Sequence, residues 1–472
     1  MLSLHSGSGR GACGGISRRE FIRIGSLGLG GLALPDLLAA RAQAADADLL
    51  IKDKSVVLLF LAGGPPQHET FDPKIDIPSQ YRSMLGEVKT KLPGVNFGGT
   101  FPRLAAMADR LAIVRSCHHD NTDHDVALLH VNSGGNPLQT VMGSLYSRIA
   151  GPTHPVTGLP RGAIISPRTI DPKKYPVYKG EVPLREKFYN VGTLSPAYRP
   201  FNPSTGGQLV ENMRLQIPAR RMSDRRSLLE SLDQIKRSLD GSKALEATDR
   251  FQQQALDVVL RGAGEAFDLT QEDPRIVERY DTSQYYKNKS VPNKAAMAES
   301  WPMVLGRQML MARRLCEAGC GFVTVISSQW DLHANEDTYG IVDGMNYLGP
   351  ALDHAASAFL EDVHQRGLSE KILLVITGEM GRTPAVNKKA GRDHWGQLCP
   401  LIFAGGGLRM GQVIGKSDRQ GGAPVADPVS TQDMMATIMQ SLLDMGQLRI
   451  AENIPPEVRR ALAGGKPIKR LF

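Results

Sequence analysis

The chain has 472 residues, of which 41% are hydrophobic and 22% are charged, and this composition excludes an intrinsically disordered protein. Its formal net charge of +8 comes without a basic block or interleaved aromatic and basic residues, so we expect no nucleic acid partner. Five cysteines in a chain of this length exclude a fold held together by disulfide bonds.

Residues 1–44 have the pattern of an export signal. The paired Arg18 and Arg19 precede a short, glycine-rich apolar stretch at 24–34, and Ala42-Gln43-Ala44 forms a small-x-small cleavage site. This order resembles the twin-arginine signal of bacteria, which implies that the twin-arginine export machinery carries the folded chain to the periplasm or beyond. No later stretch reaches about 18 apolar residues, so we predict no membrane span in the mature chain.

The mature chain, 45–472, is interpreted as a single α/β domain. Short, continuous apolar runs predict strands buried on both faces at 55–62, 110–115, 321–327, 371–377 and 400–404. Helical periodicity lies between them, at 101–109, 125–132, 141–149, 303–318 and 348–366. Strands that alternate with helices predict a doubly wound, mostly parallel central sheet with helices on both faces.

Two long stretches interrupt this alternation. Residues 151–219 are rich in proline and glycine, so we expect them to wrap irregularly over the surface. Residues 220–300 are charged and helical in pattern, and we interpret them as a helical insertion rather than an independent domain.

Polar side chains gather where the predicted strands end. Ligands of open parallel sheets bind beyond the carboxyl ends of the strands, so these loops are the expected place for a site. Six of the 11 histidines lie in loops next to a strand, each with a carboxylate within four positions, namely His68, His118, His119, His124, His333 and His394.

Imidazole and carboxylate together are ligands that Zn²⁺ or Mn²⁺ prefers, so the pattern predicts a divalent metal site, with Zn²⁺, Mn²⁺, Ca²⁺ and Mg²⁺ all left open. The alternative is that each histidine lies in a loop because loops are polar, and convergence at several strand ends favours the metal. Arg382 follows the fourth strand and is expected either to bind an anionic substrate oxygen or to pair with Glu379 or another loop carboxylate.

The loop motifs, in chain order, resemble a known family. They are 61–74, Trp330-Asp-Leu-His333, 378–384, Gly391-Arg-Asp-His-Trp395 and 404–407. With the twin-arginine signal, they look like the exported bacterial proteins grouped as domain of unknown function 1501, over nearly the whole mature chain. That family is similar to the alkaline phosphatase and sulfatase superfamily, whose members are single α/β domains with metal ions at the strand ends.

The resemblance implies roles for particular residues. Asp331 and His333 resemble the superfamily's Asp-x-x-x-His metal pair, with one intervening residue instead of three, and His394 resembles its final ligand histidine. Glu379 stands in the place of a ligand aspartate, and Met380 in the place of a ligand histidine. His68, Asp72 and His124 would complete the shell.

Two positions depart from the superfamily's pattern. Gly63 and Gly64 follow the first strand, where the superfamily has a metal-binding aspartate. The nucleophile should lie near 120–125, where Thr122 has the only hydroxyl group.

Three functions remain open from the sequence. The first is a metal-dependent hydrolase of phosphate or sulfate esters, acting on a small-molecule or glycan substrate. The second is a catalytically degenerate protein of the same fold that binds an anion or a glycan. The third is a structural protein of the cell envelope, in which the loop residues form a polar network without a metal.

Overall fold

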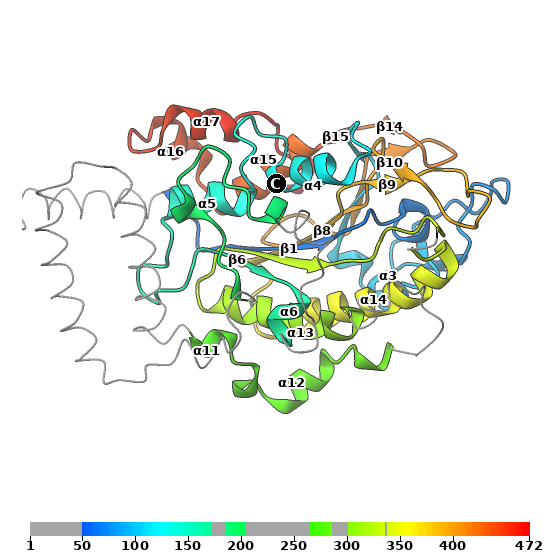
Figure 1. The fold of residues 1–472 in the computed structure, drawn as a ribbon, viewed down its shortest axis with the longest axis horizontal. Helices are drawn as coiled ribbons and strands as arrows, with labels where there is room; N and C mark the ends of the chain where they lie inside the picture. Colours follow the sequence, from blue (N-terminus) through cyan, green and yellow to red (C-terminus); the bar gives the residue numbers. More distant parts are fainter. Residues whose placement is uncertain (1–49, 172–185, 204–263, 286–300, 336–337) are drawn as a thin grey trace, which may run out of the picture. The chain divides into compact units, whose positions relative to one another are not determined.

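A seven-stranded sheet lies at the centre of the computed structural model (Figure 1). The structure describes residues 50–171, 186–203, 264–285, 301–335 and 338–472, and residues 51–472 form one unit. The expected export signal, 1–44, lies outside the described residues, as does most of the expected insertion at 220–300. In order across the sheet, the strands are β12 (Gln412–Ile414), β4 (Ala112–Val114), β11 (Leu401–Gly405), β8 (Ile372–Thr377), β1 (Ser55–Leu61), β7 (Phe322–Ser327) and β6 (Gly162–Ile165).

The sheet is mostly parallel, which confirms the predicted fold class. Strand β1 pairs in parallel with β7 and β8, β7 with β6, and β4 with β12. Strand β11 runs antiparallel to both of its neighbours, β8 and β4. All seven residues of β1 are buried, as expected for a central strand covered on both faces.

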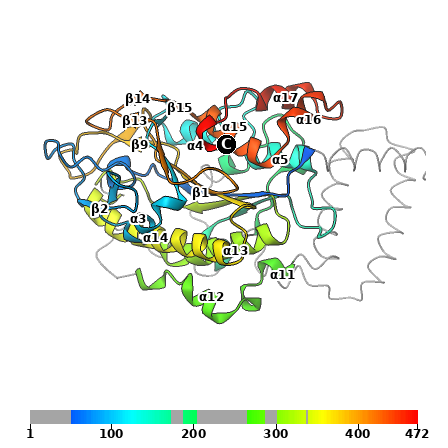
Figure 2. The same cartoon turned by 180° about the vertical axis from the view of Figure 1, so that it is seen from behind.

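Helices cover both faces of the sheet (Figures 1 and 2). One face packs against α3 (Pro102–Ala106), α13 (Trp301–Glu317) and α14 (Ile341–Gln365), and the other carries α4 (His124–Ser133), α5 (Met142–Ala150) and α15 (Thr431–Leu442). Alternate β1 residues, such as Val57 and Leu59, join Met309 of α13 and Leu352 of α14 in the main core. Burying each of these side chains contributes roughly 1.5–3 kcal/mol before conformational entropy is counted.

Shorter elements frame this core. In the described part of the chain, the remaining α-helices are α6 (Pro167–Ile170), α11 (Gly264–Phe267), α12 (Pro274–Arg279), α16 (Met445–Ile450) and α17 (Pro456–Leu462). The remaining strands form two-stranded pairs: β2 (Glu87–Lys89) with β3 (Asn96–Gly98), β5 (Cys117–His118) with β15 (Val429–Ser430), β9 (Gly381–Arg382) with β10 (His394–Trp395), and β13 (Lys416–Ser417) with β14 (Pro424–Ala426).

Two elements that bear on the site differ from the sequence-based expectation. Residues 162–165, within the stretch expected to be irregular, form the edge strand β6. Helix α14 begins at Ile341 rather than 348, although Gly344 and Gly349 lower its helix propensity. Close packing explains both glycines, because a Cβ atom on Gly344 would lie 2.3 Å from Leu332 and one on Gly349 would lie 2.4 Å from Thr100.

The described part of the expected insertion, 264–285, docks on α13 and α14 through ion pairs. The Glu272 carboxylate lies 2.6 Å from Arg313, 3.1 Å from Arg314 and 3.0 Å from Arg366. Arg313 is 1% exposed and also pairs with Asp362 at 2.9 Å. Glu272 therefore joins this segment to three guanidinium groups of α13 and of the end of α14.

Candidate metal centre

The direction of β11 brings the site loops to one edge of the sheet. In the strand register, the last residues of β1 and β7, Leu61 and Ser327, lie side by side. The first residue of β11, Leu401, lies beside Thr377 at the end of β8 and Val114 at the end of β4. The loop before the antiparallel β11 therefore meets the loops that follow the parallel strands, which is where the sequence predicted the polar groups to gather.

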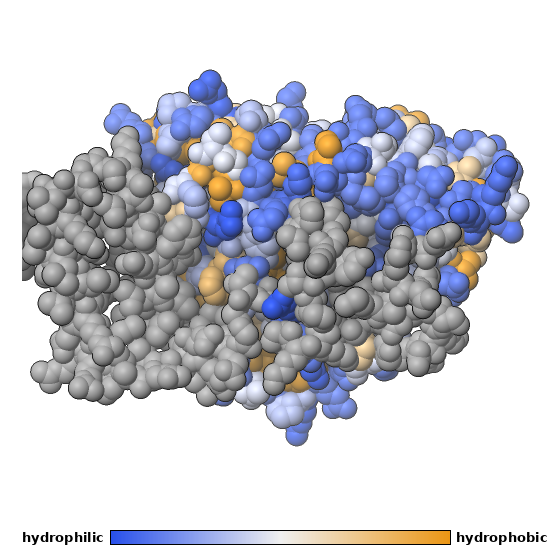
Figure 3. Space-filling model, viewed as in Figure 1, coloured by the Kyte–Doolittle hydropathy of each residue, from blue (hydrophilic) through white to orange (hydrophobic). Residues whose placement is uncertain are grey.

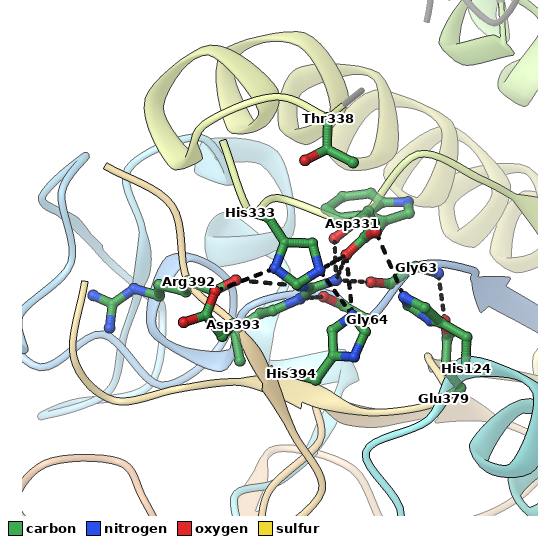
Figure 4. Close-up of polar contacts among 12 residues, drawn as sticks. Gly63, Gly64, His124, Asp331, His333, Thr338, Glu379, Arg392, Asp393 and His394 are labelled. Carbon is green, nitrogen blue, oxygen red and sulfur yellow. Dashed lines mark hydrogen bonds and ion pairs between the residues drawn. The ribbon is translucent and has the colours of Figure 1, made fainter. Parts of the chain in front are cut away.

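Four side chains from three of these loops converge at this edge (Figure 4). His124, Asp331, His333 and His394 each offer one ligand atom, and these atoms all lie within 4.8 Å of one another. The Nε2 atom of His333 lies 2.8 Å from Oδ1 of Asp331, and that of His394 lies 3.5 Å from the same oxygen. The Nε2 atom of His124 lies 3.5 Å from Oδ2 of Asp331, so the three imidazoles surround one carboxylate.

The opposite nitrogen of each imidazole faces an oxygen acceptor. The Nδ1 atom of His124 is 2.8 Å from Oε1 of Glu379, and that of His394 is 2.7 Å from the carbonyl oxygen of Thr122. The Nδ1 atom of His333 is 3.3 Å from Oδ1 of Asp393. Such outer partners fix the tautomer of metal-binding histidines, because an Nδ1–H that donates outward leaves the Nε2 lone pair free for a cation.

The donor atoms fit a divalent ion. The Nε2 atoms of His333 and His394 are 2.8 Å apart. The Thr122 carbonyl can only accept, so His394 donates its Nδ1–H to it and a neutral His394 presents a lone pair at Nε2. Two imidazole nitrogens this close need a proton or a cation between them.

Asp331 is held ionised. Burial would raise the pKa of this carboxyl, but hydrogen bonds with His124, His333 and His394 and the charge of Arg382 hold the pKa well below its usual range. The Nη2 atom of Arg382 lies 2.5 Å from Oδ1 of Asp331. The carboxylate is therefore in its charged form at neutral pH, as a metal ligand must be.

His124 carries a proton in the absence of a metal. Burial lowers the pKa of His124, but the carboxylates of Asp331 and Glu379 outweigh it and raise the pKa to about 9. His124 is the first residue of α4, and the Asp123 side chain caps this helix by accepting from the amide of Val126 at 3.0 Å. A capped helix start gives the imidazole a fixed backbone position.

Arg382 is fully buried and directs its N–H groups to the protein. Its Nε donates to the carbonyl of Gly64 at 2.8 Å, and its Nη1 donates to that of Arg392 at 3.2 Å. Its Nη2 donates to the carbonyl of Gly63 as well as to Asp331. Of the two roles expected for Arg382, pairing with a loop carboxylate is the one present in this geometry, although the partner is Asp331 rather than Glu379.

Gly63 allows the β1 loop to approach the site. Its φ is +116°, and a Cβ atom there would lie 2.5 Å from the amide nitrogen of Asp331 and 2.8 Å from that of Trp330. A side chain would therefore push the β7 loop, which carries Asp331, away from its position. The amide of Gly63 also donates to Oε1 of Glu379 at 2.7 Å.

The other expected ligands have different partners. Glu379 lies behind His124, and its Oε1 is bonded to the Nδ1 atom of that imidazole. Its Oε2 is buried and has no hydrogen-bond partner among the described residues. His68 is fully buried, its Nε2 bonded to the carbonyl of Gln420 at 2.6 Å, and burial lowers its pKa to about 3. Asp72 pairs with Lys74 at 3.0 Å and Arg115 at 3.2 Å. The group of four thus includes neither His68, Asp72 nor Glu379.

Thr122, the expected nucleophile, is exposed and contacts the site through its carbonyl oxygen. Sequence reasoning missed this carbonyl and Asp393 as partners of the imidazoles. Asp393 directly precedes His394 in the chain, and this position beside an expected ligand is the signal that could have identified it.

The site is open to solvent. The four side chains are between 19% and 28% exposed, which leaves room for a substrate group or water beside them. Around the nearby β9, β10 and β14, the visible face is mostly hydrophilic (Figure 3). Within the described ranges, no helix has both the length and the apolar character that crossing a bilayer requires.

Fold and site together define an α/β protein with a candidate metal centre at the carboxyl edge of a mostly parallel sheet. The chain belongs to the family described as protein of unknown function (DUF1501), whose model matches residues 53–453. This confirms the family expected from the loop motifs. A search of curated proteins gave no match.

Three of the solved structures that resemble this fold are distant from it in sequence and in superposition. The PsFucS1 sulfatase from Pseudoalteromonas sp. is 12% identical, with a TM-score of 0.37, and the match covers 85% of this chain and 69% of that one. The phosphonate monoester hydrolase SpPMH from Silicibacter pomeroyi is 11% identical, with a TM-score of 0.37 and coverage of 89% and 76%. The lipoteichoic acid synthase LtaP from Listeria monocytogenes is 9% identical, with a TM-score of 0.32 and coverage of 85% and 82%. None of these likenesses transfers an activity to this chain.

Proposed function

We propose that this protein is a metal-dependent hydrolase of phosphate or sulfate esters, carried on a small molecule or a glycan, and that the twin-arginine pathway exports it. One observation carries the proposal: three imidazole Nε2 atoms surround the ionised Asp331, while each Nδ1 atom faces an oxygen acceptor. This orientation is typical of metal-binding histidines, which donate the ring N–H opposite the ion to a carboxylate or a carbonyl oxygen.

The donor set suits Zn²⁺ or Mn²⁺ better than Ca²⁺ or Mg²⁺, which prefer sites made of oxygen atoms. His124, Asp331, His333 and His394 would hold the ion. When bound, a divalent ion supplies Lewis acidity, which polarises an ester oxygen and makes a nucleophile available at neutral pH.

The chain's own residues position this chemistry. Arg382 fixes the Asp331 carboxylate through its Nη2 atom, and Glu379 fixes the imidazole of His124. The hydroxyl of Thr122, an exposed residue two positions before His124, is the proposed nucleophile, and water takes that role if Thr122 does not.

A second candidate is a protein that binds an anion or a glycan without cleaving it. The hydrogen bonds of Arg382 favour this binding protein. A guanidinium that already donates to Gly63, Gly64 and Asp331 is not free to neutralise a transferred phosphoryl or sulfuryl group. The two candidates share the metal and differ in turnover.

The test combines metal analysis with turnover of aryl phosphate and aryl sulfate esters. The wild-type protein, loaded with Zn²⁺ or Mn²⁺, should retain the metal after gel filtration and cleave at least one ester class. The double variant Asp331→Ala, His394→Ala should lose both properties. A matched double variant, Asp343→Ala with His364→Ala, changes an exposed aspartate and an exposed histidine of α14 and should keep both.

The outcomes separate the candidates. Retained metal without turnover of any ester supports the binding protein, and turnover in metal-free buffer contradicts the metal-dependent mechanism. Thr122→Ala keeps the backbone carbonyl that His394 needs, so it should keep the metal and lose turnover by about 10³-fold or more if the hydroxyl is the nucleophile. Full turnover in this variant assigns the attack to water.

A further inference from the structure

Two buried cysteines lie in contact beside the candidate metal centre. The Sγ atoms of Cys117 and Cys399 are 3.2 Å apart, and the residues are 0% and 3% exposed. Their backbones are also joined, because the amide of Cys399 donates to the carbonyl of Cys117 at 2.8 Å. Two side chains so close, with their backbones held together, need a movement of only about 1 Å to reach bonding distance between the sulfurs.

The position of this pair in the chain links it to the site. Cys117 begins β5, and the segment that follows it leads to His124 at the start of α4. Cys399 comes five residues after His394. A second backbone hydrogen bond, from His119 to Gly396 at 2.9 Å, runs between the same two segments. A covalent bond here would join the bases of the two loops that carry His124 and His394.

We propose that Cys117 and Cys399 are an oxidisable pair, which a small peroxide slowly closes into a disulfide that locks these two loops together. Cys399, which is 3% exposed where Cys117 is fully buried, attacks the peroxide first and forms a sulfenic acid with release of one water. The Cys117 sulfur then displaces the hydroxyl group as a second water. In sum, two thiols and one hydrogen peroxide give one disulfide and two waters. The effect on metal retention rests on the proposed function, whereas the disulfide chemistry does not.

The pair is slow to react in the folded protein. The hydrogen bond with Cys399 and then burial raise the pKa of the Cys117 thiol well above its usual value. A thiol with so high a pKa has little thiolate at neutral pH, so the pair is unsuited to attacking a substrate. Oxidation should accordingly take hours rather than seconds and should be faster at higher pH.

The experiment maps the disulfide directly. The full chain, in the presence and absence of Zn²⁺, is incubated with hydrogen peroxide, unfolded, alkylated and digested without reductant. Mass spectrometry should find the peptides of Cys117 and Cys399 joined, with the loss of two hydrogen atoms, and neither of these thiols alkylated. Peptide mapping is preferable to thiol counting because Cys13 adds a fifth thiol.

The chain contains a matched control pair. Cys316 and Cys320 are 7% and 1% exposed, and they should remain fully alkylated after the same treatment. Cys320→Ser should form the Cys117–Cys399 peptide as the wild type does, and Cys399→Ser should not form it. Alkylation of Cys117 and Cys399 in the treated wild type, or linkage of Cys316 to Cys320 instead, overturns the proposal.

A second measurement tests the consequence for the site. The bridged protein should release Zn²⁺ to a chelator several-fold more slowly than the same protein after reduction, while Cys399→Ser should show no effect of peroxide. Equal release rates from bridged and reduced protein overturn the claim that the disulfide locks the two ligand loops together. A bridge that forms in protein with no affinity for Zn²⁺ contradicts the proposed function and leaves the disulfide assignment standing.

Discussion

Glu379 lies beneath the candidate centre with its two carboxylate oxygens in different environments. Its Oε1 accepts from Gly63 and from His124, and the residue is 1% exposed. Its Oε2 has no hydrogen-bond partner in the described part of the chain. A buried carboxylate tolerates this only with compensation nearby, which the charge on His124 or on an ion bound to His124 provides.

Removing the Glu379 carboxylate should weaken metal binding without removing a ligand. We predict that Glu379→Ala lowers the affinity for Zn²⁺ by about 10–100-fold, because His124 loses the partner that fixes its ring. Glu379→Gln keeps an oxygen acceptor for the same Nδ1–H and should lose less. Competition with a fluorescent zinc chelator measures both affinities.

The exposed Glu361→Gln on α14 is the control and should bind Zn²⁺ as the wild type does. Equal affinities in Glu379→Ala and Glu361→Gln would show that Glu379 does not support the site.

The sequence predicts seven metal ligands. Four of them converge in the structure, and His68, Asp72 and Glu379 lie outside this group. Asp331 and His333 come four and six residues after the end of β7, and His394 is the first residue of the short strand β10, so their backbones have little freedom to carry them elsewhere. His68 lies seven residues beyond β1, after the turn at Gly63 and Gly64, and bonds to Gln420 instead. The direction of such a turn depends on φ values that residue types in a loop do not specify.

At the scale of elements, one helix caps another. The Asp353 side chain of α14 accepts from the amides of Arg103 at 2.9 Å and Leu104 at 2.8 Å, at the start of α3. No side chain caps α3 from its own N-cap position, Phe101. Burial raises the pKa of Asp353 to about 6, and the two amide hydrogen bonds only partly oppose this shift.

This raised pKa makes the stability of the fold depend on pH in a defined direction. The pKa of Asp353 in the unfolded chain is close to 3.8, so between about pH 4 and 6 the folded state holds more protons at this site. The contribution of Asp353 to stability therefore falls as pH rises through this window and is constant above it. Between pH 5 and 7 the loss should be roughly 1–2 kcal/mol.

Asp353→Asn should remove this dependence, because an amide does not titrate. The measurement is urea unfolding of both proteins at pH 5 and at pH 7, with the exposed Asp343→Asn of the same helix as control. The difference in unfolding free energy between wild type and Asp353→Asn should change with pH, and that for Asp343→Asn should not. If the unfolding free energies of wild type and Asp353→Asn change equally between pH 5 and pH 7, the pKa of Asp353 is not raised in the folded protein.

The elements that sequence predicts best are those buried on both faces. The apolar runs of β1, β7 and β8 are six or seven residues long and rich in Val, Ile and Leu, which favours a central strand over a buried helix. The direction of β11 could not be predicted from its own residues, because it depends on the route of the 23 residues between Thr377 and Leu401. Strand β6 has four residues in a stretch rich in proline and glycine, too few to show a pattern.

For the whole molecule, the site ties together segments far apart in sequence. Its ligand atoms come from α4, from the loop after β7 and from β10, and His124 lies more than 200 residues before the other three ligands in the chain. An ion bound there acts only on the folded state, since the unfolded chain cannot bring these groups together. Metal binding should therefore appear as global stability as well as local order.

We predict that Zn²⁺ raises the melting temperature of the whole protein and that a chelator reverses the change. At a free concentration of about 100 times its Kd, an ion adds about 2.7 kcal/mol, which for a domain of this size is about 3 °C. Differential scanning calorimetry of wild type with Zn²⁺, with Mg²⁺ and with chelator measures the effect, and Mg²⁺ should produce a smaller shift because imidazole suits it poorly. The double variant Asp331→Ala, His394→Ala should melt at one temperature in all three buffers. If the melting temperature of the wild type is also the same with Zn²⁺, with Mg²⁺ and with chelator, the three imidazoles and Asp331 form a polar network without a metal. A structural protein of the cell envelope would have such a network.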